Sequence, residues 1–97
     1  MKADTFEELV KSIGSATKIL QQQMRDVLPS IRFEISDIIA HSDGNIERVE
    51  RLLDILLDYN QLGVGTREFK RLNGYYAKVN PKNARFYETE YRKQNSE

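Results

Sequence analysis

Apolar residues spaced three and four positions apart run along most of this chain, and this spacing limits the folds open to it. Side chains with that spacing share one face of an α-helix, whereas a half-buried strand alternates at every second residue. The clearest run is a seven-residue repeat with intermediate positions filled. Its members are Phe6, Leu9, Ile13, Ala16, Leu20 and Val27. The sequence therefore predicts an all-α fold.

Proline, glycine and capping residues set the expected ends of five helices. Pro29 disfavours helical geometry in the residue before it, so we expect the first helix to stop there. Asn80 and Pro81 form a cap followed by proline at the first helical position, which is a start signal. Between these points, Gly63 ends one helix and Thr66 caps the next. The predicted helices are 6–28, 30–42, 46–60, 66–79 and 81–93.

Length and composition favour one soluble domain. The 97 residues fit a single compact bundle over 1–97, with the last few residues frayed. No apolar run is longer than three residues, as in Ile55-Leu56-Leu57, so no membrane span is expected. The chain contains no cysteine, which excludes a disulfide scaffold and a thiolate metal site and fits a cytoplasmic location.

Residues suited to catalysis are few. Glu34, Asp37 and His41 lie near one face of the expected second helix, an arrangement that a metal site can use. Metal-binding bundles, however, draw carboxylates from four helices and use two histidines, and this chain has one His. The segment Gly63-Val64-Gly65 lacks the preceding strand of a phosphate-binding loop. We therefore expect a non-enzymatic protein without a metal or cofactor.

The net charge is zero, but the two ends of the chain differ. Residues 1–60 hold seven basic and eleven acidic residues, which gives a net charge of −4. Residues 61–97 hold eight basic and four acidic residues, which gives a net charge of +4. Aromatic residues also concentrate in 61–97, and such a surface suits phosphates or an acidic protein. The alternative is packing against the acidic end of this chain or of a second copy. The predicted partner or nucleic-acid surface consists of Arg67, Lys70, Arg71, Tyr75, Lys78, Lys82 and Arg85.

The stretch from Leu62 to Leu72 combines a glycine turn with a basic helix. Its apolar residues are Leu62, Val64, Phe69 and Leu72, and the polar residues that follow the turn include Arg67, Lys70, Arg71 and Asn73. This arrangement resembles the turn and recognition helix of the helix-turn-helix family, which implies DNA binding through helices 46–60 and 66–79. An αα-hairpin is the alternative, because Tyr59 stands where that family has a small residue at the helix crossing.

The repeat in the first helix is long enough to pair with another helix. Packing on its own bundle is the alternative, since Val10, Ile19 and Met24 widen the apolar stripe. A homodimer is expected to use the face formed by Phe6, Ile13, Leu20 and Val27. The sequence thus predicts a macromolecular interaction or regulatory module that binds a protein partner or itself, with nucleic-acid binding as the alternative.

Overall fold

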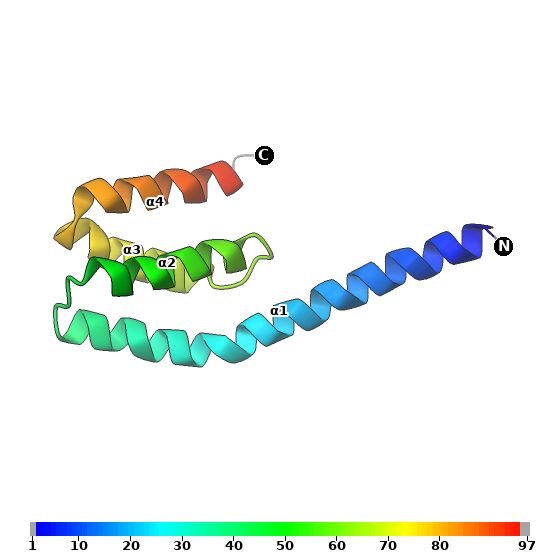
Figure 1. The fold of residues 1–97 in the computed structure, drawn as a ribbon, viewed down its shortest axis with the longest axis horizontal. Helices are drawn as coiled ribbons and strands as arrows, with labels where there is room; N and C mark the ends of the chain where they lie inside the picture. Colours follow the sequence, from blue (N-terminus) through cyan, green and yellow to red (C-terminus); the bar gives the residue numbers. More distant parts are fainter. Residues whose placement is uncertain (1, 96–97) are drawn as a thin grey trace.

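Four α-helices account for most of residues 2–95, the part of the chain that this computed structural model describes, with side chains from residue 7 onward (Figure 1). They are α1 (Lys2–Ala40), α2 (Ile46–Asn60), α3 (Thr66–Val79) and α4 (Pro81–Gln94). Residues 2–95 contain no strand. The predicted all-α class is confirmed, and the last three predicted helices match the observed bounds to within one residue.

The prediction of two helices before residue 43 is wrong, and so is the count of five. α1 starts at Lys2 and continues through Pro29 to Ala40. Pro29 cannot donate a hydrogen bond to the carbonyl of Arg25, a loss that costs about 3 kcal/mol or more inside a helix. Both residues are exposed, so water can solvate the freed carbonyl, while Leu28 and Ile31 are buried in the core. Their burial offsets the cost, and α1 bends near the proline instead of ending (Figure 1).

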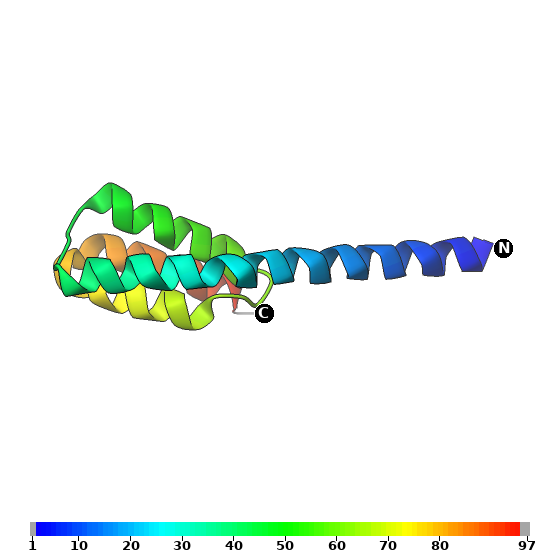
Figure 2. The same ribbon diagram turned by 90° about the horizontal axis from the view of Figure 1, so that it is seen from below.

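The helices form an antiparallel α2–α3 hairpin with α1 on one side and α4 on the other (Figures 1 and 2). Within the described residues α1 and α4 do not contact each other. The molecule measures 59 × 27 × 19 Å, because the first half of α1 extends past the other helices. We call residues 21–95 the body and residues 2–20 the projecting half. The predicted compact bundle describes the body alone.

The core of the body draws on all four helices and on the loop between α2 and α3. α2 contributes four buried apolar residues, in keeping with the dense apolar pattern of its sequence. The core residues are Leu28, Ile31, Ile35, Ile38, Val49, Leu52, Leu53, Leu56, Val64, Phe69, Leu72, Tyr76, Ala84 and Tyr87. None of them lies before Leu28, so the projecting half takes no part in this core.

Polar contacts fix the turn between α1 and α2. Asn45 caps α2, and its side chain accepts a hydrogen bond from the backbone N–H of Arg48 at 3.0 Å. The Arg48 guanidinium donates to Asp43 at 2.9 Å and to Asp37 at 3.0 Å. The backbone N–H of Asn45 and the guanidinium of Arg48 both hold the pKa of Asp43 below its usual value. The end of α1 is thereby tied to the first turn of α2.

In the loop between α2 and α3, the residue that caps α3 is not the predicted Thr66. Thr66 is the first residue of α3, and the cap position belongs to Gly65, which has a left-handed φ of 81°. A Cβ at Gly65 would lie 3.0 Å from a methyl group of Leu56, so both backbone conformation and close packing require glycine. Asn60 closes the loop, because its buried amide donates to the carbonyl of Val64 at 2.9 Å.

Candidate interaction surfaces

The projecting half of α1 carries an apolar stripe that no other element of the described chain covers (Figure 1). Leu9, Ile13 and Leu20 expose 57%, 60% and 44% of their surfaces. Ala16 lies on the same face and is also exposed. We call these four residues the projecting stripe. Among the described side chains of α1, the first that bonds to another element is Gln21, which donates to the carbonyl of Leu62 at 2.9 Å.

The predicted pairing face extends beyond this stripe at both ends. Val27 continues it into the body and remains 43% exposed, whereas the side chain of Phe6 lies outside the described residues. Val10 and Ile19, which widen the stripe, are exposed, but Met24 packs partly against the core. The alternative prediction, that α1 packs on its own bundle, therefore holds for the segment from Met24 onward but not for residues 7–20.

Arg67 and Arg71 of the predicted basic surface lie at a concavity of about 410 Å³ between α1 and α3. At its floor, the buried carboxylate of Glu68 accepts a hydrogen bond from Nε of Arg32 at 2.6 Å. Burial alone would raise the pKa of Glu68, but the Arg32 hydrogen bond and the nearby positive charges outweigh it, so this pKa lies below its usual value. Arg71 donates to the hydroxyl of Ser36 at 3.2 Å, which links α3 to α1.

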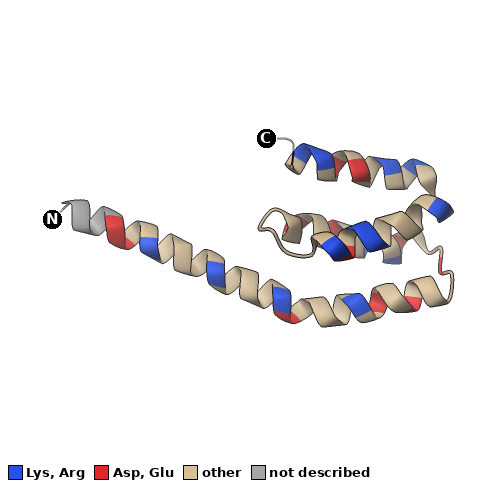
Figure 3. Ribbon diagram, turned by 180° about the vertical axis from the view of Figure 1, so that it is seen from behind, with Lys and Arg blue, Asp and Glu red and all other residues tan. Residues whose placement is uncertain are grey.

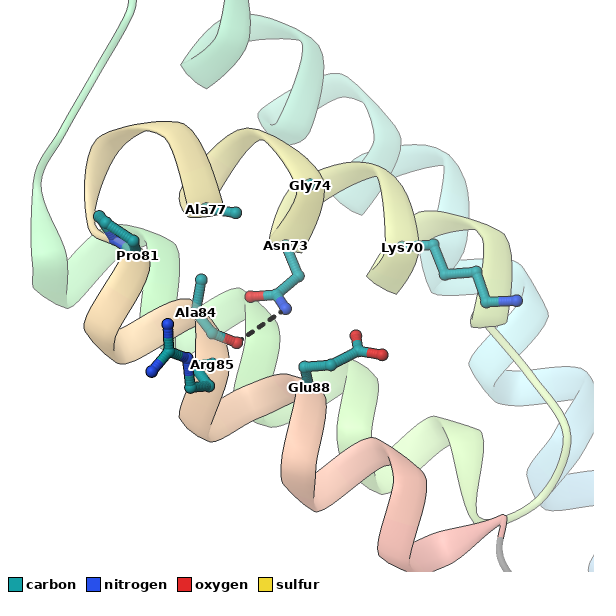
Figure 4. A pocket seen from close by; sticks show the side chains of 8 residues that line it. All are labelled: Lys70, Asn73, Gly74, Ala77, Pro81, Ala84, Arg85 and Glu88. Atoms are coloured by element: carbon teal, nitrogen blue, oxygen red, sulfur yellow. Dashed lines mark hydrogen bonds between the residues drawn. The ribbon is translucent and has the colours of Figure 1, made fainter.

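Lys70 and Arg85 lie on the other side of α3, at a groove of about 390 Å³ between α3 and α4 (Figure 4). Small residues form much of its wall, and Glu88 adds one carboxylate. Asn73 spans the two helices by donating to the carbonyl of Ala84 at 3.0 Å. The complete lining is Lys70, Asn73, Gly74, Ala77, Pro81, Ala84, Arg85 and Glu88. This lining lacks a histidine or hydroxyl nucleophile and presents cations at its edge.

Three further members of the predicted surface occupy different positions. Lys78 and Lys82 are exposed on either side of the short connection between α3 and α4. Tyr75 is half-buried and donates its hydroxyl proton to the carbonyl of Asp43 at 2.7 Å. Tyr75 therefore braces the α1–α2 turn, and the structure separates it from the exposed basic residues.

Among the described residues, no ion pair joins a basic residue of the predicted surface to an acidic residue. Within the described residues, the ion pairs that involve α3 or α4 are Arg32–Glu68, Arg92–Glu88 and Lys93–Glu90. None of them includes Arg67, Lys70, Arg71, Lys78, Lys82 or Arg85. Acidic residues of α2 instead accept hydrogen bonds from buried tyrosines, Glu50 from Tyr76 at 2.6 Å and Asp54 from Tyr87 at 2.8 Å.

Sequence reasoning missed a second basic feature, a row of residues seven positions apart along α1 (Figure 3). We call Lys11, Lys18, Arg25 and Arg32 the basic row. Seven residues fall about 20° short of two full turns, so the row stays on one side of the helix. Contacts of Arg32 with Glu68 and of Ser36 with Arg71 identify that side as the one that faces α3. The seven-residue spacing of the cations was the signal in the sequence.

The α2–α3 pair departs from the geometry that the helix-turn-helix resemblance implies. In that motif the two helices cross at roughly 90–120° so that the second can enter the major groove. Here α2 and α3 run antiparallel, side by side (Figures 1 and 2). Tyr59 is half-buried against the core at the end of α2. The arrangement is the αα-hairpin, the alternative that the bulk of Tyr59 favoured.

The acidic residues around His41 are engaged with arginines. Glu34 pairs with Arg51 at 3.2 Å, and Asp37 pairs with Arg48 at 3.0 Å. The His41 ring nitrogen lies 3.2 Å from a carboxylate oxygen of Asp37 and is largely exposed. In the described part of the chain no group of three or more His, Cys, Asp or Glu residues is placed to hold a metal ion.

None of the helices among residues 2–95 combines the length and the apolar content needed to cross a membrane. Comparison with models of protein families, with curated proteins and with solved structures finds no match to this chain.

Proposed function

We propose that this protein is a non-enzymatic interaction module whose contact element is the projecting half of α1, which pairs with another helix. The observation that carries the proposal is the exposure of Leu9, Ile13 and Leu20 on a half of α1 that no other described element covers. Burial of one such side chain contributes about 1.5–3 kcal/mol, so a partner helix would gain substantially from covering three. Because the chain contains no cysteine, the proposal places the module in the cytoplasm.

The length of the projecting half supports this proposal. Residues 2–20 span about 28 Å at 1.5 Å per residue, enough for three layers of knobs-into-holes contacts. An isolated helix of this length is marginal in water, and Gly14 in its middle lowers its stability further. A partner that covers the projecting stripe would therefore stabilise the helix as well as the complex.

The test compares two variants that each introduce an aspartate in the same turn of α1. Ile13→Asp places a charge on the projecting stripe, whereas Ser15→Asp places one on an exposed position well away from it. We expect the unaltered chain and Ser15→Asp to capture the same partner, or a second copy, and Ile13→Asp to lose it. If every partner bound all three chains with equal affinity, the proposal would be refuted.

Nucleic-acid binding is a second candidate, and the basic row favours it. Lys11, Lys18 and Arg25 are exposed, and the row continues to Arg32, which lines the same concavity as Arg67 and Arg71. A cationic strip of this kind suits the phosphate backbone, with little dependence on base sequence. The antiparallel α2–α3 hairpin does not favour reading of bases in the major groove. The second candidate function is therefore binding to the phosphate backbone without base recognition.

Fluorescence anisotropy with a mixed-sequence duplex at two salt concentrations tests the second candidate. We expect affinity to fall steeply with salt and to drop further in the Arg67→Ala/Arg71→Ala double variant. Arg92→Ala is the matched control, because it removes a cation that pairs with Glu88 on α4. Absence of binding at low salt would eliminate this candidate and leave the first unaffected.

A further inference from the structure

We propose that the concavity between α1 and α3 binds one doubly charged phosphate group through Arg32, Arg67 and Arg71. The inference goes beyond the proposed helix pairing, because it uses no residue of the projecting stripe. It also differs from contact with a nucleic-acid backbone, since a single phosphate group is enclosed here instead of many lying along exposed cations. The positions of the guanidinium groups, the balance of charge and the lining of the concavity support it.

Two of the three guanidinium groups are held in place and still have N–H groups to spare. Nε of Arg32 donates to the buried carboxylate of Glu68 at 2.6 Å, and one Nη of Arg71 donates to the hydroxyl of Ser36 at 3.2 Å. Each guanidinium carries five N–H donors. Among the described residues, no hydrogen bond engages either Nη of Arg32 or the side chain of Arg67. The concavity therefore presents positioned donors that the folded chain does not use.

The charges around the concavity are unbalanced. Arg67 and Arg71 lie one turn apart on α3, a spacing at which like charges destabilise a helix. Arg32 brings a third cation from α1, and among the described residues of the lining Glu68 is the only acidic one. The pKa of Glu68 lies below its usual value, so this carboxylate is ionised at neutral pH. The lining thus keeps a net charge of +2. A phosphate monoester carries close to two negative charges and would balance it, whereas one carboxylate would not.

The size and lining of the concavity suit a small anion. Glu68 and Ile35 are buried, while the three arginines of the lining are exposed. The volume of about 410 Å³ falls within the range of about 300–1,000 Å³ that is common for small-ligand sites. Planar guanidinium groups bind phosphate oxygens through paired N–H donors. The described lining holds no aromatic ring on which a nucleobase could stack, so a phosphorylated serine or threonine side chain, or free phosphate, fits it better than a nucleotide.

Titration with inorganic phosphate at about pH 8 and constant ionic strength, followed by NMR of the arginine Nε–H groups, tests the site. We expect saturable shifts for the unaltered chain, and a dissociation constant at least about 10-fold higher for Arg67→Ala/Arg71→Ala. This variant retains Arg32, because its loss would leave the buried carboxylate of Glu68 unpaired. Backbone amide spectra should show an intact body in each variant.

Lys82→Ala/Arg85→Ala is the matched control, since it removes two exposed cations of α4 that do not line the concavity. We expect this variant to bind phosphate as the unaltered chain does. Absence of saturable binding, or affinities that do not differ between the two double variants, would overturn the proposal.

Three small anions test the charge of the ligand. Methyl phosphate carries close to two negative charges at this pH, dimethyl phosphate carries one and has the phosphodiester chemistry of a nucleic-acid backbone, and acetate carries one. We expect methyl phosphate to bind at least about 10-fold more tightly than the other two. Equal binding of dimethyl phosphate would overturn the doubly charged ligand in favour of backbone contact. Equal binding of acetate would overturn it in favour of an acidic peptide.

N-acetyl-O-phosphoserine amide and adenosine monophosphate distinguish the carriers of the phosphate group. Tighter binding of the phosphoserine derivative than of inorganic phosphate would identify a phosphorylated side chain as the ligand, and the reverse order would identify free phosphate. Tightest binding of the nucleotide would overturn the assignment of the carrier. Ile13→Asp, which tests helix pairing, should bind phosphate as the unaltered chain does, because Ile13 does not line the concavity. Failure of the helix pairing is thereby distinguishable from failure of the phosphate site.

Discussion

The two halves of α1 have similar apolar spacing and entirely different surroundings. In the body, Ile35 and Ile38 are fully buried beneath α2 and α3. In the projecting half, Ile13 stands on a comparable face and exposes 60% of its surface. The apolar spacing specifies which face of a helix avoids water, but it does not specify whether the covering surface comes from the same chain.

Hydrogen-bonding contacts also distinguish the two halves. Within the body, the side chain of Arg32 bonds to Glu68, and the side chain of Glu34 bonds to Arg51. In the projecting half, the described side-chain hydrogen bond is a local one, from Thr17 to the carbonyl of Ile13. The body is held by contacts between its helices, whereas a helix held by few contacts depends on a partner.

The largest expected difference between the halves is in the cost of removing an isoleucine side chain. Ile35→Ala should lower the free energy of unfolding by about 2–5 kcal/mol, because it leaves a cavity in a packed core. Ile13→Ala should change it by less than about 0.5 kcal/mol at concentrations where the chain is monomeric. Urea unfolding followed by circular dichroism measures both. A similar loss in the two variants would mean that the projecting half packs on the body in solution.

Much of the fold could be predicted from the sequence, because local signals define most of its helices. Asn80 and Pro81 mark a helix start that the structure reproduces. The helix end predicted at Pro29 is wrong, because the local penalty of proline is smaller than the gain from burying Leu28 and Ile31 on the other face. The αα-hairpin was among the alternatives, and the bulk of Tyr59 at the expected helix crossing favoured it.

The candidate surfaces were predictable in part. The seven-residue repeat marked the face of Ile13 and Leu20 correctly as apolar, but its exposure depends on where the other helices end. The sequence identified the basic residues. It did not show that Arg67 and Arg71 lie on one side of α3 and Lys70 and Arg85 on the other, because this depends on the direction of each side chain. Tyr75 was assigned to that surface because it lies among cations in the sequence, and its bond to Asp43 connects segments 32 residues apart.

The next largest effect concerns the ion pair that joins α1 to α3 in the body. Glu68→Gln should lower the free energy of unfolding by about 1–3 kcal/mol at neutral pH, because a buried acceptor of a charged hydrogen bond is weakened. Since the pKa of Glu68 in the folded chain lies below 4.5, the unfolded chain binds more protons near that pH, and stability falls as the pH drops below 4.5.

Acid unfolding of the unaltered chain and of Glu68→Gln measures this contribution. The variant should lose less stability between neutral pH and acid, while retaining the part that comes from Asp43, whose pKa is also lowered. Glu88→Gln is the control, because its pair with Arg92 lies on the surface and contributes little. Identical acid profiles for the unaltered chain and Glu68→Gln would show that the Arg32–Glu68 pair does not determine acid stability.

A smaller effect, of opposite sign, is expected where the projecting half meets the body. Pro29→Ala restores an N–H that can bond to the carbonyl of Arg25, so we expect a gain of about 1–2 kcal/mol in the free energy of unfolding. Ser30→Ala, at the neighbouring exposed position, is the control. Thermal unfolding measures the change. A loss of stability in Pro29→Ala would mean that the bend is required for Leu28 and Ile31 to reach the core.

The smallest effect separates the halves by their response to alkali. The Tyr87 hydroxyl donates to Asp54 at 2.8 Å, so Tyr87→Phe should cost about 1 kcal/mol at neutral pH. Burial, followed by the hydrogen bond to Asp54, raises the pKa of Tyr87 above 10.0. Above pH 10 the unfolded chain therefore releases this proton first, and the unaltered chain loses stability as the pH rises.

The alkaline loss should be smaller in Tyr87→Phe, though not absent, because burial and Glu50 also raise the pKa of Tyr76. Asp54→Asn separates the causes, since an amide oxygen still accepts the hydrogen bond but carries no negative charge. Stability curves from pH 7 to 12, measured by circular dichroism, compare the three chains. Equal alkaline losses would show that Tyr87 does not hold its proton more tightly in the folded chain.

The projecting stripe contains no titratable group, so its pairing with another helix should change little over the pH range in which the body loses stability. Such a difference between pairing and body stability would show that the two halves of α1 are stabilised independently.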